Sequence, residues 1–157
     1  MGKVEEGLAE AIRSKQKFAD ESCYTLTIPA STIAKIHLMK EDYHSALEEV
    51  DYGLQLVEKN EERVHEAELW RIRAVALSKI SGEDTDPASA FEESLSIAEE
   101  MKIPLWKFRT LHSMYEFYKE DDAKKQFVKA ELQKHIEEYP ESEGFKEYAV
   151  TVKLLNE

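Results

Sequence analysis

Apolar residues recur along most of this chain at steps of three and four positions. The segment 43–57 is typical, because its apolar positions fall on one face of a helix. They are Tyr43, Ala46, Leu47, Val50, Leu54 and Val57. Alternation of apolar and polar residues, which favours a strand, is confined to residues 24–28 before Pro29. The pattern therefore predicts an all-α protein.

Short breaks separate the predicted helices. They fall at 40–42, at 81–86, before Pro104, at 120–122 and at 140–144. Asp86 followed by Pro87 is typical of an N-cap and a first helical residue. The predicted helices are 3–19, 25–39, 43–60, 64–81, 87–102, 105–119, 122–138 and 143–156. Because the loops are short, we expect antiparallel neighbours within one domain spanning 1–157.

The helices carry two recurring signatures, which indicates an internal repeat. The first, third, fifth and seventh helices place a large apolar residue four positions after a small or apolar one, and a small residue three further on. The copies are Val4, Leu8 and Ala11; Ala46, Val50 and Gly53; Pro87, Phe91 and Ser94; and Ala123, Phe127 and Ala130. The small residue allows a neighbouring helix to approach closely, and the large one fills the space between helices.

The other four helices carry a complementary signature with a small residue between bulky ones. Its copies are Phe145, Tyr148, Ala149 and Val152; Phe108, Leu111, His112 and Tyr115; Trp70, Arg73, Ala74 and Leu77; and Ala30, Ile33, Ala34 and His37. Together the signatures resemble the tetratricopeptide repeat, whose paired helices carry W-x2-L-G-x2-Y and A-x3-F-x2-A. Segments 67–74 and 90–98 are similar to the long repeats in C-terminal regions of large signal-transduction ATPases and transcription activators. The resemblance implies a right-handed α-solenoid of three to four helical hairpins.

Charge narrows the range of partners. The chain has 21 basic and 33 acidic residues, a formal net charge of -12, which repels phosphate backbones and anionic lipid headgroups. We therefore expect neither nucleic acid nor a membrane as partner. A single cysteine, Cys23, cannot form an internal disulfide, and the N-terminus lacks the apolar run of a signal peptide. These features predict a cytoplasmic protein.

No motif in the sequence indicates catalysis. The five histidines form no helical zinc motif, and the chain has no Gly-rich phosphate loop, no G-x-S-x-G and no C-x-x-C. Adjacent glutamates such as Glu48 and Glu49 point about 100° apart on a helix, so they do not converge on one atom. We expect no enzyme activity, no metal and no cofactor. A helical metal protein or enzyme is the weakest alternative.

The candidate binding residues lie on the second, fourth and sixth helices, which line the concave surface in this class of repeat. By register they are Ser31, Lys35, Arg71, Val75, Trp106, Arg109 and Ser113. Arg71 and Arg109 occupy the same repeat position and can hold a partner's carboxylate through paired hydrogen bonds, with Trp106 as an aromatic anchor. In the other interpretation, the arginines pair with carboxylates of their own surfaces, and Trp106 belongs to the core.

These observations predict a non-catalytic protein-interaction or scaffolding module that binds a peptide or protein segment on its concave face. The alternative is a structural or sensory segment of a larger transcriptional or signalling regulator. The phase of the repeats supports the alternative, because the chain opens with the second helix of one repeat and closes with the first helix of another. Solenoid ends are apolar, so we expect polar caps or a homodimer formed through the ends.

Overall fold

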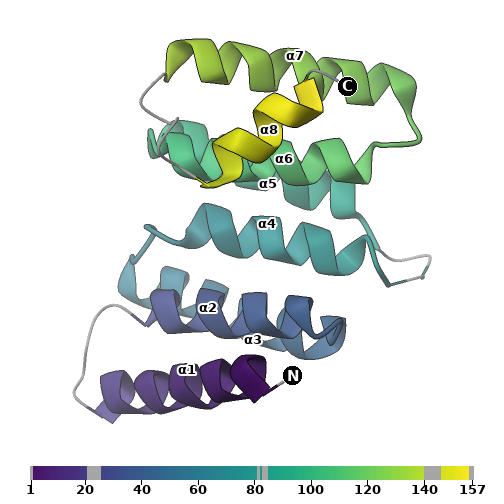
Figure 1. Cartoon of the computed structure of the whole chain (residues 1–157). Coiled ribbons are helices and arrows are strands. Elements are labelled where there is room, and N and C mark those ends of the chain that lie inside the picture. Colours follow the sequence, from purple (N-terminus) through teal and green to yellow (C-terminus); the bar gives the residue numbers. More distant parts are fainter. Residues whose placement is uncertain (1, 21–25, 81, 83–84, 140–145, 156–157) are drawn as a thin grey trace. The chain divides into compact units, whose positions relative to one another are not determined.

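A computed structural model describes residues 2–20, 26–80, 82, 85–139 and 146–155, which form eight α-helices and no strand (Figure 1). The helices are α1 (Gly2–Asp20), α2 (Thr27–Met39), α3 (Tyr43–Asn60), α4 (Glu66–Leu77), α5 (Pro87–Glu100), α6 (Pro104–Phe117), α7 (Asp122–Glu138) and α8 (Lys146–Leu155). The prediction of an all-α chain is confirmed. The largest difference from the expected ranges is at α4, which is shorter at both ends.

Aspartates begin three of the helices. The side chain of Asp42 accepts a hydrogen bond from the backbone N–H of Ser45 at 3.2 Å, and Asp121 accepts one from Lys124 at 3.1 Å. Asp86 accepts one from the N–H of Ser89 at 3.0 Å. An N-cap of this kind satisfies a backbone donor that has no partner within the helix. The predicted cap at Asp86 is confirmed.

The helices pack in chain order within two compact units, Met1–Ser94 and Leu95–Glu157, whose boundary falls within α5. In the first unit, α1 packs on α2, α2 on α3 and α3 on α4, and α2 also contacts α4 (Figure 1). In the second unit, α6 contacts α7 and α7 contacts α8. Such sequential packing is consistent with helical hairpins. The single domain expected from chain length stays a prediction.

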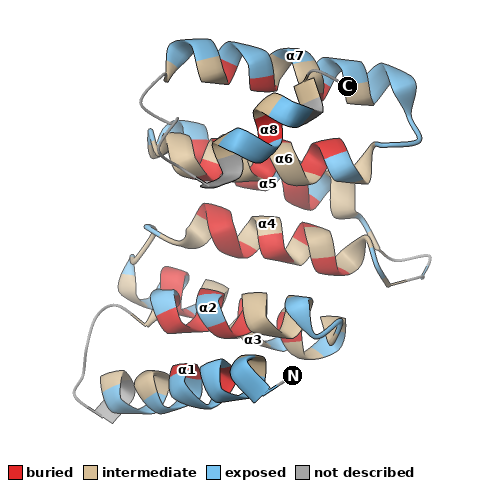
Figure 2. Cartoon of the chain, viewed as in Figure 1, coloured by how far each residue is buried: buried red, intermediate tan, exposed pale blue. Residues whose placement is uncertain are grey.

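The core of the first unit lies between α2, α3 and α4. Its central cluster consists of Ala34, Val50, Val57, Leu69 and Ile72, and Leu8 and Ala11 of α1 form a smaller cluster with Ile33. Figure 2 shows buried stretches on α2 and α4. The small-large-small copy at Ala46, Val50 and Gly53 is buried throughout, as are Phe91 and Ser94 of the next copy.

The fourth copy of that signature falls on the wrong face of its helix. Phe127 is 64% exposed, and Ala123 and Ala130 are exposed too. Helix α7 instead buries Val128, Leu132 and His135. Because each helical residue turns the side chain by about 100°, a shift of one position moves the whole set to another face. The buried face of α7 therefore contains Val128 and Leu132, and the neighbouring ring of Phe127 lies outside it.

The matching signature on α8 is wrong at Ala149. Ala149, expected at the close approach of two helices, is exposed, whereas Thr151 is fully buried. The Oγ1 of Thr151 lies 3.4 Å from Nδ1 of His112 on α6. Phe145, the first residue of that copy, lies outside the described residues, as does Cys23.

Candidate functional site

Helix α4 is buried along two opposite sides. Leu69 and Ile72 belong to the central cluster with α2 and α3. On the other side Ala67 and Ala74 are buried, and the carbonyl of Ala67 accepts a hydrogen bond from the hydroxyl of Ser94 on α5 at 2.7 Å. Two further faces of α4 remain between these sides, about 180° apart at 100° per residue. Each of them forms a distinct polar arrangement with a neighbouring helix.

The first of these faces joins α2 to α4 through a polar seam of six residues. Thr27, Ser31 and Lys35 follow each other at steps of four on one face of α2, and they lie opposite Glu62, His65 and Glu68. Thr27 donates to the Glu62 carboxylate from both its backbone N–H and its hydroxyl. The hydroxyl of Ser31 lies 2.9 Å from Nδ1 of His65, and Lys35 Nζ lies 3.7 Å from Oε1 of Glu68.

Glu68 is the most deeply buried charge of the polar seam, with 1% of its surface exposed. A buried carboxylate is costly unless it is paired, and Arg71 supplies that pairing. The guanidinium donates from Nε to Oε2 at 2.7 Å and from Nη2 to Oε1 at 3.0 Å. The side chain of Lys35, by contrast, is 45% exposed, and at 3.7 Å its ammonium is too far from Glu68 for a hydrogen bond. Lys35 therefore places a partly exposed ammonium beside a fixed ion pair.

Ser31, Val75 and Arg71 are the other sequence-predicted residues of the first unit, and each of them lies in this seam or beside it. Ser31 is buried, and its hydroxyl also lies 3.0 Å from the carbonyl of Ile28, to which it donates. Val75 is half-buried, and its carbonyl accepts from the hydroxyl of Ser78 at 2.7 Å. Arg71 pairs with Glu68 of its own helix, as the second interpretation of the sequence anticipated.

The three predicted residues of the second unit lie together on α6. Trp106 is only 8% exposed, so its ring does not stand out as an open anchor. The guanidinium carbon of Arg109 lies 5.2 Å from the centre of that ring, a cation–π distance. The hydroxyl of Ser113 donates to the carbonyl of Arg109 at 3.0 Å. Because Arg71 and Arg109 belong to different units, their joint action on one carboxylate stays a prediction.

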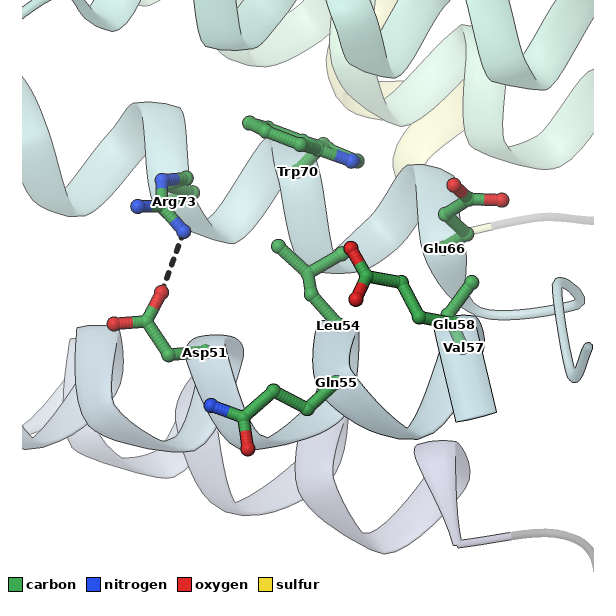
Figure 3. A pocket seen from close by; sticks show the side chains of 8 residues that line it. All are labelled: Asp51, Leu54, Gln55, Val57, Glu58, Glu66, Trp70 and Arg73. Atoms are coloured by element: carbon green, nitrogen blue, oxygen red, sulfur yellow. Dashed lines mark hydrogen bonds and ion pairs between the residues drawn. The ribbon is translucent and has the colours of Figure 1, made fainter. Parts of the chain in front are cut away.

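The second remaining face of α4 borders a pocket that sequence reasoning missed. It has a volume of about 370 Å³ and lies between α3 and α4 (Figure 3). Its lining residues are Asp51, Leu54, Gln55, Val57, Glu58, Glu66, Trp70 and Arg73. The spacing of Glu66, Trp70 and Arg73 on one helical face was the available signal. Their meeting with α3 depends on how the two helices cross, which spacing alone does not give.

In the second unit, His135 is a buried titratable group. Only 2% of its surface is exposed, and within the described part of the chain neither ring nitrogen has a hydrogen-bond partner. Its ring centre lies 5.4 Å from that of Phe108 and 4.9 Å from that of Tyr139. Burial lowers the pKa of His135 below its ordinary value of 6.5, and the nearby positive charge of Lys107 lowers it further. Both effects favour the neutral form of the imidazole.

Two further properties of the described residues concern metal binding and membrane insertion. Among them, no three or more His, Cys, Asp or Glu side chains come together in a way that could hold a metal ion. In the same part of the chain, no helix has both the length and the apolar character to cross a bilayer. No protein-family model matches the sequence, and no curated protein or solved structure shows significant similarity to it.

Proposed function

We propose that this chain is a non-catalytic protein-interaction module built from tetratricopeptide-like hairpins, and that it binds an acidic peptide segment along the polar seam. The observation that carries the proposal is the position of Lys35. Its ammonium lies at an exposed edge of the seam, next to the buried ion pair of Glu68 and Arg71. Lys35 thus adds a second cation beside Glu68, at one end of a seam whose other end holds the carboxylate of Glu62, in a chain of net charge -12.

The spacing of contacts across the seam supports the repeat. Thr27 and Glu62 are 35 positions apart, and Ser31 and His65 are 34 apart. Lys35 contacts Glu68 at a similar interval. The tetratricopeptide repeat has a period of about 34 residues, close to these contact intervals, whereas the sequence signature recurs after 40 positions between Ala30 of α2 and Trp70 of α4. Helices α2 and α4 would then be the first helices of two neighbouring repeats, and the seam would lie on the concave surface.

Charge alone does not give such a site its affinity. A partly exposed ion pair contributes roughly 0.2–1 kcal/mol, so Lys35 sets the register and selects for a carboxylate rather than providing most of the binding energy. Ile28, which is exposed, and Val75, which is half-buried, provide apolar surface on the same faces of α2 and α4. We expect the partner to combine an acidic residue with apolar side chains on either side of it.

The test is a selection of random peptides displayed on phage, followed by affinity measurement with synthetic copies of the enriched sequences. We expect enriched peptides to share an acidic residue, and Lys35→Glu to weaken their binding by about fivefold, because the ion pair is replaced by repulsion. Arg71→Glu is a poor probe, because it would bring a second carboxylate against buried Glu68 and threaten the fold.

Lys59→Glu is the matched control, because Lys59 is an exposed lysine of α3 outside the seam. It makes the same charge change and should leave the affinity within about twofold. Circular dichroism of both variants would establish that helical content is kept. Failure to enrich any acidic consensus, or equal losses in the two variants, would refute peptide binding at the polar seam.

A further inference from the structure

The pocket between α3 and α4 already holds a cation at one end. Arg73 Nη1 donates to Oδ1 of Asp51 at 2.6 Å, and the guanidinium carbon lies 5.4 Å from the centre of the Trp70 ring. Figure 3 shows this pair on one side of the pocket, with the indole of Trp70 above Leu54. The combination of a carboxylate and an indole face is the environment that favours a guanidinium. The chain's own arginine thus shows which kind of group this wall accepts.

The other end of the pocket carries negative charge that no cation of the pocket neutralises. The carboxylate of Glu58 lies beside Leu54 in Figure 3, and within the described residues it has no hydrogen bond or ion pair. Glu66 lies at the same end and pairs with Arg63 at 2.6 Å. A bound cation can therefore pair with Glu58 without breaking an existing ion pair, whereas Asp51 and Glu66 are already paired with arginines.

We propose that this pocket binds the basic side chain of a partner polypeptide, with arginine preferred to lysine. The aliphatic part of that side chain would pack on Leu54 and Val57, its cationic head would stack on Trp70, and Glu58 would neutralise it. Arginine is preferred because a planar guanidinium stacks on an indole and forms paired hydrogen bonds with a carboxylate, whereas an ammonium does neither.

The charge of the lining excludes an anionic ligand. Three carboxylates, Asp51, Glu58 and Glu66, line the pocket against one arginine, which is itself paired with Asp51. A purely apolar ligand would cover the Glu58 carboxylate without neutralising its negative charge, which is unfavourable. The proposal is independent of peptide binding at the polar seam, because the pocket lies on the opposite face of α4 and uses none of the residues of the seam.

The test follows the indole N–H signals of the two tryptophans by NMR while N-acetyl-L-arginine amide is added. The signal that Trp70→Phe removes belongs to Trp70, and that of buried Trp106 serves as an internal reference. We expect a saturable shift of the Trp70 signal with the arginine derivative and a weaker one with N-acetyl-L-lysine amide. The citrulline derivative, which has nearly the same shape but no charge, should give no saturable shift.

Glu58→Gln should raise the dissociation constant of the arginine derivative about threefold, the size of one partly exposed ion pair. Glu48→Gln is the matched control, because Glu48 is exposed on the same helix but does not line the pocket, and it should leave the constant unchanged. Equal responses to arginine and citrulline, equal effects of the two glutamine variants, or no saturable shift at all would each overturn the proposal.

Discussion

A Cβ atom at Gly53 would lie 2.8 Å from both Cδ atoms of Leu69. Real side chains do not approach so closely, so α3 and α4 can pack at this distance only because position 53 has no side chain. The same Cβ would lie 3.4 Å from that of Ala30, which brings α2 to the same point. Gly53 is therefore a point of close approach for the three helices of the central core, and Leu69 fills the space that a side chain at position 53 would need.

Gly53→Ala tests this packing. Alanine would favour the helix by about 1 kcal/mol, but overpacking a buried site costs about 1–3 kcal/mol. Leu69 is fully buried within the central cluster, so its side chain cannot move aside without disturbing its neighbours. We expect overpacking to prevail and the free energy of unfolding to fall by about 1 kcal/mol in urea denaturation.

Gly7→Ala is the matched control for that measurement. Gly7 also lies within a helix, but an added Cβ there would meet no atom within 4 Å. The same substitution should therefore raise the free energy of unfolding by up to about 1 kcal/mol. A stabilising effect of similar size at both positions would show that Leu69 accommodates the extra methyl group.

The contrast between Gly53 and Phe127 shows how far residue spacing predicts packing. At Gly53 the adjacent apolar residues Leu47 and Leu54 lie on the same broad face as Ala46, Val50 and Gly53, so the spacing indicates a single buried face. In α7 the large residues Phe127 and Val128 are neighbours, and either can begin a buried face. The choice depends on how α7 lies against α6, which is a property of tertiary packing.

The same limit applies to the candidate sites. Helical register predicted that Ser31, Lys35 and Arg71 line a concave groove, and that groove stays a prediction. In the structure Ser31 and Lys35 lie against His65 and Glu68, and Arg71 pairs with Glu68. Their partners Glu62 and His65 precede α4, and only the path of the chain before that helix brings them to α2. The pocket around Trp70 likewise requires the crossing of α3 and α4, so no pattern within one helix could reveal it.

The register of α7 can be checked by a pair of substitutions. Phe127→Ser removes an exposed ring and should change the free energy of unfolding by less than about 0.5 kcal/mol. Val128→Ala removes two methyl groups from a fully buried position and should lower it by about 2 kcal/mol. Fluorescence of Trp106 in a Trp70→Phe background would report on the second unit. A larger loss of stability in Phe127→Ser than in Val128→Ala would show that Phe127 is buried, as the sequence signature predicted.

Glu68→Gln should destabilise the first unit strongly, because it leaves the partly buried guanidinium of Arg71 without its carboxylate. Removal of one member of a buried pair typically costs about 3–5 kcal/mol, and we expect about 3 kcal/mol here because 13% of the Arg71 side chain is exposed. Urea denaturation gives the value. The double variant Glu68→Gln, Arg71→Met removes both charges and should recover part of the loss. If it were no more stable than Glu68→Gln alone, the cost would lie in packing and not in the unpaired charge.

His135 should make the second unit sensitive to mild acid. Its ring is buried against Phe108 and Tyr139, and burial lowers its pKa below the ordinary value of 6.5, which the unfolded chain keeps. Well above pH 6.5 the group is neutral in both the folded and the unfolded state, so it does not make the stability depend on pH. Below it the unfolded state binds a proton that the folded state resists, so the free energy of unfolding falls as the pH falls.

The expected slope is at most about 1.4 kcal/mol per pH unit, the limit for one proton. His135→Phe keeps an aromatic ring in the stack but cannot titrate, so it should lose less stability than the wild type between pH 7 and pH 5.5. At pH 7 the variant should be at least as stable, because it replaces two buried ring nitrogens that have no partner among the described residues. Denaturation curves at several pH values, with the four other histidines common to both proteins, isolate the effect. Parallel pH profiles for the two proteins would mean that the folded state accepts the proton at no cost.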